Sequence, residues 1–210
     1  MSSKAQEVKL SKTLSWILRH GALAEKLPIQ NDGFVKITDL LANRNFKGVT
    51  IEMIKHVVDT NDKKRYYMEL VNGEMMIRAN QGHTLKEVDN VELRKVNTVN
   101  DIPVIPPATH SMVIHGTYKK HLVSILEKGL NKMDRNMIHF AIGDNGGVTS
   151  GMRNGCDMVI IIDLQLALDD GIEFFLSAND VALTNGIDGI LPKKYFEKII
   201  DRKGMTIWQR

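Results

Sequence analysis

Residues 66–79 read YYMELVNGEMMIRA, and this stretch decides the fold of the first part of the chain. Its two apolar runs, 66–71 and 75–79, flank Asn72-Gly73-Glu74. An Asn-Gly pair between two such runs is a strong signal for a tight turn, because both residues tolerate the left-handed backbone conformation that the turn requires. The stretch therefore predicts a β-hairpin.

The residues before the hairpin show helical periodicity. Residues 8–19 carry apolar side chains at helical spacing, and Gly21 follows where a helix would end. After a short strand at 34–37, Thr38 and Thr50 can each cap a further helix. Three helices followed by a hairpin are typical of a winged helix, which we expect for the first lobe.

The second part of the chain is predicted to be rich in strands. A helix is expected at 118–128, closed by Gly129, and strands are expected at 112–115, 137–142, 158–163, 174–176 and 181–184. Between the two parts, residues 89–110 contain three prolines and few periodic apolar residues, which is typical of a linker. The sequence thus predicts an α+β protein with lobes at 1–88 and 111–210, joined by a linker at 89–110.

The composition is that of an ordinary folded protein, with 43% hydrophobic and 25% charged residues among 210. It excludes long disordered segments. The single cysteine, Cys156, excludes an internal disulfide framework and fits a reducing compartment. No window approaches the length of a membrane span. We expect a cytoplasmic or nuclear monomer with no membrane contact.

Positive charge is concentrated at the beginning of the chain. Residues 1–86 carry 14 Lys and Arg against 9 Asp and Glu, whereas residues 87–210 carry 14 against 16. A cationic first lobe suits a partner with phosphate groups. The charge alone is equally compatible with ordinary solvated faces.

Within the first lobe, the pair Arg19-His20 stands at the end of the first expected helix. A guanidinium offers two parallel donors to phosphate oxygens, and an imidazole adds another. The alternative is that a helix C-terminus simply favours cations, and spacing alone favours this alternative. Lys63-Lys64-Arg65 forms a second basic cluster, which could equally be a solvated turn. Arg78 and His83 add donors, although a lone histidine is more often structural.

Candidate ligand-binding residues of the second lobe begin with His115-Gly116-Thr117, where a strand gives way to a helix. Glycine there lets a ligand approach the backbone closely. Arg135, His139 and Arg153 are further polar residues whose presence is otherwise hard to explain. The histidines and the cysteine show no zinc-type spacing, and the chain has neither a P-loop nor a Gly-x-Gly-x-x-Gly fingerprint. A metal is therefore not indicated.

Taken in order, the motifs resemble the tRNA 2′-phosphotransferase family along nearly the whole chain. They are LSKTLSWILRH (10–20), DGFV (32–35), NDKKRY (61–66), IRANQGH (77–83), HGT (115–117), RNMIH (135–139), SGMR (150–153), Asp163 and SANDVALT (177–184). The resemblance implies a winged-helix N-terminal lobe and an ADP-ribosyltransferase-like C-terminal lobe, with the active site in the cleft between them.

The resemblance also implies a reaction that consumes NAD as a co-substrate and uses no metal. The 2′-phosphate of a spliced tRNA, or of another RNA, would attack C1″ of the nicotinamide ribose and expel nicotinamide. The ribose 2″-hydroxyl would then attack the phosphate of the ADP-ribosylated RNA. The products would be RNA with a 2′-hydroxyl and ADP-ribose 1″,2″-cyclic phosphate, as in the final step of tRNA splicing.

Residue roles follow from the same motifs, as what the resemblance implies. Because the nucleophile is already an anion, cationic donors rather than a general base should dominate the site. Arg19, His20 and Arg65 would hold the 2′-phosphate, and Arg135 would stabilise the charge of the second step. The NAD-binding residues would be His115, Gly116, Thr117, His139, Arg153, Ser177 and Asn179, and the RNA-binding residues would be Lys64, Arg78 and His83.

Two positions depart from the family pattern Arg-x-His-x-His-Leu-Ser, because the chain has Met137 and Ala141 in place of a histidine and the serine. These changes remove two polar groups, so we expect a slower reaction or a compensated pocket. An alternative function is an ADP-ribosyltransferase that stops after the first step, on a nucleic-acid phosphate or another acceptor. A second alternative is a non-catalytic winged-helix RNA-binding protein. Arg135 argues against the first alternative, and the motifs at 115–117 and 151–153 argue against the second.

Overall fold

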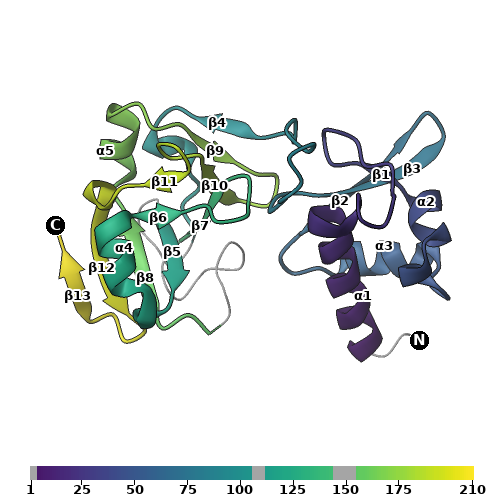
Figure 1. The fold of residues 1–210 in the computed structure, drawn as a ribbon, viewed down its shortest axis with the longest axis horizontal. Coiled ribbons are helices and arrows are strands. Elements are labelled where there is room, and N and C mark those ends of the chain that lie inside the picture. Colours follow the sequence, from purple (N-terminus) through teal and green to yellow (C-terminus); the bar gives the residue numbers. More distant parts are fainter. Residues whose placement is uncertain (1–3, 106–111, 144–154) are drawn as a thin grey trace. The chain divides into compact units, whose positions relative to one another are not determined.

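The computed structural model describes residues 4–105, 112–143 and 155–210. The chain divides into two compact units, Met1–Glu92 and Leu93–Arg210, which are drawn in Figure 1. Both units mix helices with antiparallel sheet, so the expected α+β class is confirmed. No helix within the described ranges is both long and apolar enough to cross a bilayer.

The helices of the first unit depart from the sequence prediction at two of their ends. Helix α1 (Lys4–Trp16) does not stop before Gly21, because a π-helical turn (Ile17–Gly21) continues it. Thr38 does not cap α2 (Ile37–Ala42), since Lys36 stands at the N-cap position. The expected cap of α3 (Ile51–Asp59) is confirmed, because the side chain of Thr50 accepts a hydrogen bond from the backbone N–H of Met53.

The sheet of the first unit has three strands in the order β1-β3-β2, namely β1 (Val35–Lys36), β2 (Tyr66–Val71) and β3 (Glu74–Ala79). The predicted hairpin is confirmed as β2 and β3. Asn72 and Gly73 in its turn have φ angles of 51° and 83°, the left-handed conformation that their residue types favour. The order of elements in the unit is helix, strand, two helices and hairpin.

Tyr66 links the hairpin to the first helix. Its ring is buried at the start of β2, and its hydroxyl donates a hydrogen bond of 2.5 Å to the carbonyl oxygen of Ser11. The same hydroxyl lies 3.0 Å from the Ser11 hydroxyl and 2.6 Å from that of Ser15. A buried phenol needs such partners, because an unmet hydroxyl would cost about 1–3 kcal/mol. Tyr66 therefore helps to fix the end of α1 against the sheet, next to the π-helical turn.

The second unit is built on an eight-stranded antiparallel sheet in the order β13-β12-β8-β5-β7-β10-β9-β4. In chain order its strands are β4 (Arg94–Val96), β5 (Val113–Thr117), β7 (Ile138–Ile142), β8 (Met158–Ile162), β9 (Phe174–Leu176), β10 (Val181–Thr184), β12 (Phe196–Asp201) and β13 (Thr206–Gln209). A small sheet pairs β6 (Leu130–Asn131) with β11 (Ile190–Leu191). The helices are α4 (Leu122–Lys128), which ends at Gly129 as expected, and α5 (Leu164–Asp169).

The range predicted to be a linker is only partly irregular. Residues 94–96 form β4, which pairs with β9 at the edge of the large sheet. Residues 99–101 form a 3₁₀ turn closed by a capping box of Thr98 and Asp101. The boundary between the units lies at Glu92 and Leu93, and the rest of the predicted linker includes residues 106–110, which lie outside the described ranges.

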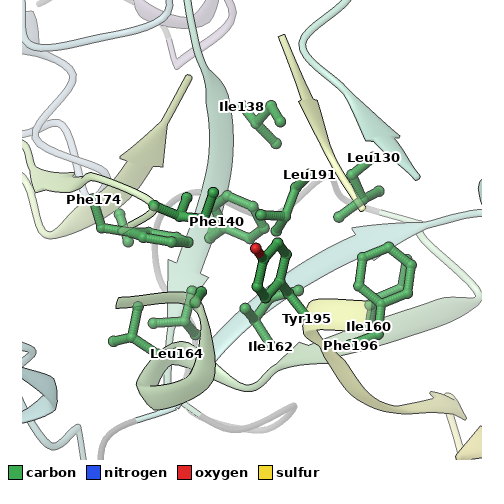
Figure 2. Close-up of a cluster of buried hydrophobic side chains, with 14 of the residues drawn as sticks. Leu130, Ile138, Phe140, Ile160, Ile162, Leu164, Phe174, Leu191, Tyr195 and Phe196 are labelled. Atoms are coloured by element: carbon green, nitrogen blue, oxygen red, sulfur yellow. The ribbon is translucent and has the colours of Figure 1, made fainter. Parts of the chain in front are cut away.

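The large sheet is packed on both faces, which explains why its central strands are mostly apolar. One face carries the main core, shown in Figure 2, where Phe140, Phe174 and Phe196 pack with Tyr195. The other face carries a smaller cluster of Ile114, Ala141, Val159 and Ile161. Successive residues along β5 and β7 therefore point to opposite faces of the sheet, and this alternation decides on which face each candidate site residue lies.

Candidate functional site

Arg19 and His20 lie on the π-helical turn that follows α1. The Arg19 side chain is half-buried and that of His20 is exposed, with its Nδ1 3.0 Å from the hydroxyl of Thr84. Trp16 covers Gly21 so closely that a Cβ there would lie 2.7 Å from the indole ring. Single π-helical turns often accompany functional sites, because the wider turn re-aims the side chains on it. The sequence prediction of a cationic pair at this helix end is confirmed in position, but the turn that presents it was not foreseen.

Arg65 lies at the end of a tight turn before β2. The amide oxygen of Asn61 accepts hydrogen bonds from the backbone N–H of Arg65 (3.1 Å) and from its Nη1 (3.3 Å). Lys64 has a φ angle of +41°, a left-handed conformation that is uncommon for a residue with a side chain. On the other side of the turn, Nδ2 of Asn80 donates to the carbonyl oxygen of Lys64 at 2.7 Å. The guanidinium is thus held by contacts within the first unit.

The segment from Asn80 to Thr84 joins the two cationic positions. The backbone N–H of Asn80 donates to the carbonyl oxygen of Arg65 (2.9 Å), and that of Thr84 donates to the carbonyl oxygen of Arg19 (2.9 Å). Gly82 between them has a φ angle of +91°, and a Cβ on it would lie 3.4 Å from Nε of Arg19. The structure therefore brings Arg19, which is 46 positions before Arg65 in the chain, to the same five-residue segment.

Arg78 is placed differently from the other candidate cations. Its side chain is only 6% exposed, and its guanidinium lies over the rings of Phe34 (4.8 Å) and Tyr67 (5.4 Å). It also forms an ion pair of 3.1 Å with Glu92, whose own side chain is exposed. These contacts hold the guanidinium in place within the protein. Among the three expected RNA-binding residues, Lys64 is the exposed one.

His83 is buried at 4% exposure, and its Nε2 has no hydrogen-bond partner within the described ranges. Burial lowers the pKa of His83 from 6.5 to about 4, and the positive charges of Arg19, His20 and Arg78 contribute further to the decrease. The imidazole is therefore neutral at physiological pH, because protonation would place a desolvated charge beside other cations.

This lowered pKa predicts a pH-dependent stability. The unfolded chain takes up a proton on this histidine near pH 6.5, but the folded protein does so only near pH 4. Stabilisation is therefore complete above pH 6.5 and is lost as the pH falls toward 4, and linkage gives a loss of about 2 kcal/mol between pH 7 and pH 5. We expect urea denaturation of His83→Gln to show a correspondingly smaller decrease in unfolding free energy over this range. Equal decreases in both proteins would contradict the assignment.

In the second unit, His115 and His139 lie on the neighbouring strands β5 and β7. Nδ1 of His115 is 2.9 Å from the carbonyl oxygen of His139, and Nδ1 of His139 is 2.9 Å from that of Met137. A carbonyl oxygen can only accept, so Nδ1 carries the hydrogen in both rings. In a neutral ring this leaves Nε2 as the accepting nitrogen. Both histidines are therefore suited to accept a hydrogen bond from a hydroxyl group.

The pleat of the sheet separates these two side chains. Ile114 pairs with Ala141, and the ring of His115 makes an edge contact of 5.8 Å with Phe140. His115 and Thr117 therefore point to the face of the main core, whereas Gly116 and His139 belong to the opposite face. The motif at 115–117 and His139 lie on neighbouring strands. The imidazoles of His115 and His139 nevertheless point to opposite faces of the sheet.

The remaining candidates of the second unit lie in turns. Ser177 and Asn179 are buried before β10, where the Ser177 hydroxyl donates to Oδ1 of Asn179 (2.9 Å) and accepts from the backbone N–H of Val181 (3.1 Å). Arg135 is half-buried and precedes β7, which begins at Ile138. Arg153 lies outside the described residues.

Sequence reasoning missed the residues that hold the cationic side chains. Asn61 and Asn80 entered only as parts of motifs, and Thr84 directly follows one. These three residues supply hydrogen bonds to the turn of Arg65 and to the turn of Arg19 and His20. Asparagine beside a basic run is the signal that could have suggested the first of these, because its side chain often closes a turn. Within the described ranges, no group of three or more His, Cys, Asp or Glu could hold a metal ion.

Comparisons with known proteins agree with the motifs on which this site is built. Residues 5–186 match the model of the "RNA 2'-phosphotransferase, Tpt1 / KptA family". The chain is 46% identical over 200 residues to a Homo sapiens protein named tRNA 2'-phosphotransferase 1, with 93% of this chain and 76% of that protein covered. It is 35% identical over 189 residues to a probable RNA 2'-phosphotransferase of Rhodopirellula baltica, with 89% and 95% covered.

A relative from Schizosaccharomyces pombe, a putative tRNA 2'-phosphotransferase, is 42% identical over 202 residues. The match covers 95% of this chain but only 53% of that protein, so the chain spans about half the length of this relative. The family match nevertheless covers both structural units, from α1 to the turn before β11. The chain belongs to the RNA 2'-phosphotransferase, Tpt1 / KptA family.

Proposed function

We propose that the protein transfers the internal 2′-phosphate of an RNA, such as a spliced tRNA, to NAD. The observation that carries the proposal is the segment Asn80–Thr84, which is hydrogen-bonded to the backbones of both Arg65 and Arg19. Cationic donors fixed in this way can hold a phosphate dianion without reorganising, which is the main electrostatic need of such a reaction. The names of the family and of the relatives supply the substrate class.

In this proposal the first unit is a winged-helix lobe that binds the RNA. Its order of helix, strand, two helices and hairpin supports this, as does its excess of positive charge. Arg19, His20 and Arg65 hold the 2′-phosphate, whereas Lys64 contacts the RNA backbone. Arg78 and His83 are buried, so they support this surface from within and stabilise it.

The second unit would be an ADP-ribosyltransferase-like lobe that binds NAD as a substrate. Its acceptors suit hydroxyl groups of a nucleotide, because His115 and His139 are fixed in tautomers whose Nε2 accepts a hydrogen bond. The two imidazoles lie on opposite faces of the sheet, so they would not contact the same ribose. Gly116 and Thr117 at the end of β5 would lie against the nucleotide, and Arg153, Ser177 and Asn179 are further contacts proposed from the motifs.

The proposed reaction has two steps. A 2′-phosphate oxygen of the RNA bonds to C1″ of the nicotinamide ribose as the bond from C1″ to nicotinamide breaks. The ribose 2″-hydroxyl then bonds to phosphorus as the bond to the RNA 2′-oxygen breaks, and the hydroxyl proton passes to that oxygen. The cationic residues steer the first step by orienting an anion, and Arg135 stabilises the additional negative charge of the second.

An RNA oligonucleotide with one internal 2′-phosphate tests this proposal. On incubation with the protein and NAD, we expect nicotinamide release, loss of the phosphate from the RNA, and a nucleotide with the mass of ADP-ribose cyclic phosphate. The same RNA with a 2′-hydroxyl is the control and should release no nicotinamide. RNA that gains the mass of ADP-ribose and stops there would show a one-step transferase, and binding without nicotinamide release would show a non-catalytic RNA-binding protein.

A further inference from the structure

We propose that Asn61 is a positioning residue for Arg65, whose neutral amide holds the guanidinium in place without cancelling its positive charge. The inference deepens the proposed function and rests on it, since it concerns the arginine assigned to the 2′-phosphate.

The geometry at Asn61 fixes Arg65 at two points. One side-chain oxygen accepts from the backbone N–H of Arg65 at 3.1 Å and from its Nη1 at 3.3 Å. The backbone carbonyl oxygen of Asn61 accepts from the N–H of Lys64 at 2.8 Å, which closes the turn. The main chain and the tip of the Arg65 side chain are thus tied to the same amide group, so the guanidinium cannot swing independently of the turn.

Asn80 supports the same turn from the adjacent end of β3. It is 95% buried, and it bonds to the carbonyl oxygens of both Lys64 (through Nδ2, 2.7 Å) and Arg65 (through its backbone N–H, 2.9 Å). These bonds hold Lys64 in its left-handed conformation, with φ at +41°. A strained backbone of this kind persists only where its surroundings impose it, and such strain tends to gather at functional sites.

Two other arginines of the first unit are held by carboxylates instead. Arg44 bonds to both carboxylate oxygens of Glu25 at 2.9 and 3.3 Å, and Arg78 pairs with Glu92 at 3.1 Å. Arg65, by contrast, forms no ion pair with any residue in the described ranges. Burial lowers the pKa of the neighbouring Lys63, and the charge of Arg65 lowers it further. The positive charge of Arg65 therefore acts on groups near the turn.

The charge of the group at position 61 decides how much positive potential the turn offers to a phosphate. A carboxylate at position 61 could make the same two hydrogen bonds, and it would make them more strongly because it is charged. It would also attract the guanidinium away from a phosphate and reduce the positive potential at the turn. A neutral acceptor positions the guanidinium and leaves its positive charge available to the phosphate of the substrate.

The decisive variant is Asn61→Asp, which keeps an accepting oxygen in place and adds one negative charge. The measurement is the ratio of affinities for an RNA with an internal 2′-phosphate and for the same RNA with a 2′-hydroxyl. Contacts to the backbone phosphates are common to both RNAs and cancel in this ratio. We expect Asn61→Asp to lower the ratio about tenfold, the size of one charge-assisted hydrogen bond, with an unchanged thermal unfolding midpoint.

Asn72→Asp is the matched control, since it makes the same change of charge in the exposed hairpin turn of the same unit. We expect it to leave the ratio within about twofold of the wild-type value, because screening weakens a distant exposed charge. Equal ratios for wild type and Asn61→Asp would overturn the inference, and so would an equal loss in both variants. Absence of any wild-type preference for the 2′-phosphate would instead overturn the proposed function, and the assignment of Arg65 with it.

Discussion

Replacement of Arg19 by alanine is expected to lower the rate of 2′-phosphate removal about 100- to 1,000-fold, the loss found when one fixed donor to a developing charge is removed. Arg19 lies beside Gly82 on the segment that also bonds to Arg65, so its loss leaves one side of the phosphate without a cation. The expected defect is in the handling of phosphorylated RNA. Affinity for NAD should be unchanged, because the residues proposed for NAD belong to the other unit.

Single-turnover loss of the 2′-phosphate from the RNA at saturating NAD, together with NAD binding by calorimetry, checks this expectation. Arg44→Ala serves as the control, since Arg44 is an arginine of the same unit that is 83% exposed and paired with Glu25. Its removal should change neither measurement by more than about twofold, because exposed ion pairs contribute about 0–1 kcal/mol. Weaker NAD binding by Arg19→Ala, with RNA handling intact, would show that the proposed division of labour between the units is wrong.

Local sequence signals predicted those elements that residues close together in the chain stabilise. The Asn72-Gly73 turn and the Thr50 cap depend on conformations that neighbouring residues impose, and both are present as expected. The π-helical turn was missed because no periodicity records the packing of Trp16 over Gly21 that accompanies it. Strand β4 was missed for a similar reason, since three residues gain their strand conformation only by pairing with β9, some 80 positions later.

The residues of the candidate site divide in the same way, into those that motifs identify and those that act from distant positions in the chain. Motif order identified the cationic residues, because their types are dictated by the phosphate they would meet. It did not identify the neutral residues that hold them, since Asn80 reaches Lys64 and Thr84 reaches His20 across 16 and 64 positions of the chain. The motifs also assigned Arg78 and His83 to RNA binding, but the fold buries both, and burial lowers the pKa of His83.

Replacement of Arg135 by alanine is expected to separate the two proposed steps. In the first step an existing phosphate anion attacks carbon, and negative charge disperses as nicotinamide leaves. In the second, an oxygen adds to phosphorus, so charge builds on the phosphoryl oxygens, and a guanidinium there stabilises the transition state. Arg135→Ala should therefore slow the second step about 100-fold or more and the first step by less than about tenfold.

The measurement is the amount of ADP-ribosylated RNA over a single turnover, followed with RNA labelled at its end. The wild-type protein should show this species only transiently, whereas Arg135→Ala should accumulate it. Arg135 is half-buried before β7 and lies two positions before Met137, whose backbone oxygen fixes the tautomer of His139. Met137→His restores the polar residue that the motif usually carries and leaves that backbone contact in place, so it should speed the wild-type reaction without rescuing Arg135→Ala. An unchanged ratio of intermediate to product in Arg135→Ala would remove Arg135 from the second step, because loss of a residue that serves both steps equally would slow them together.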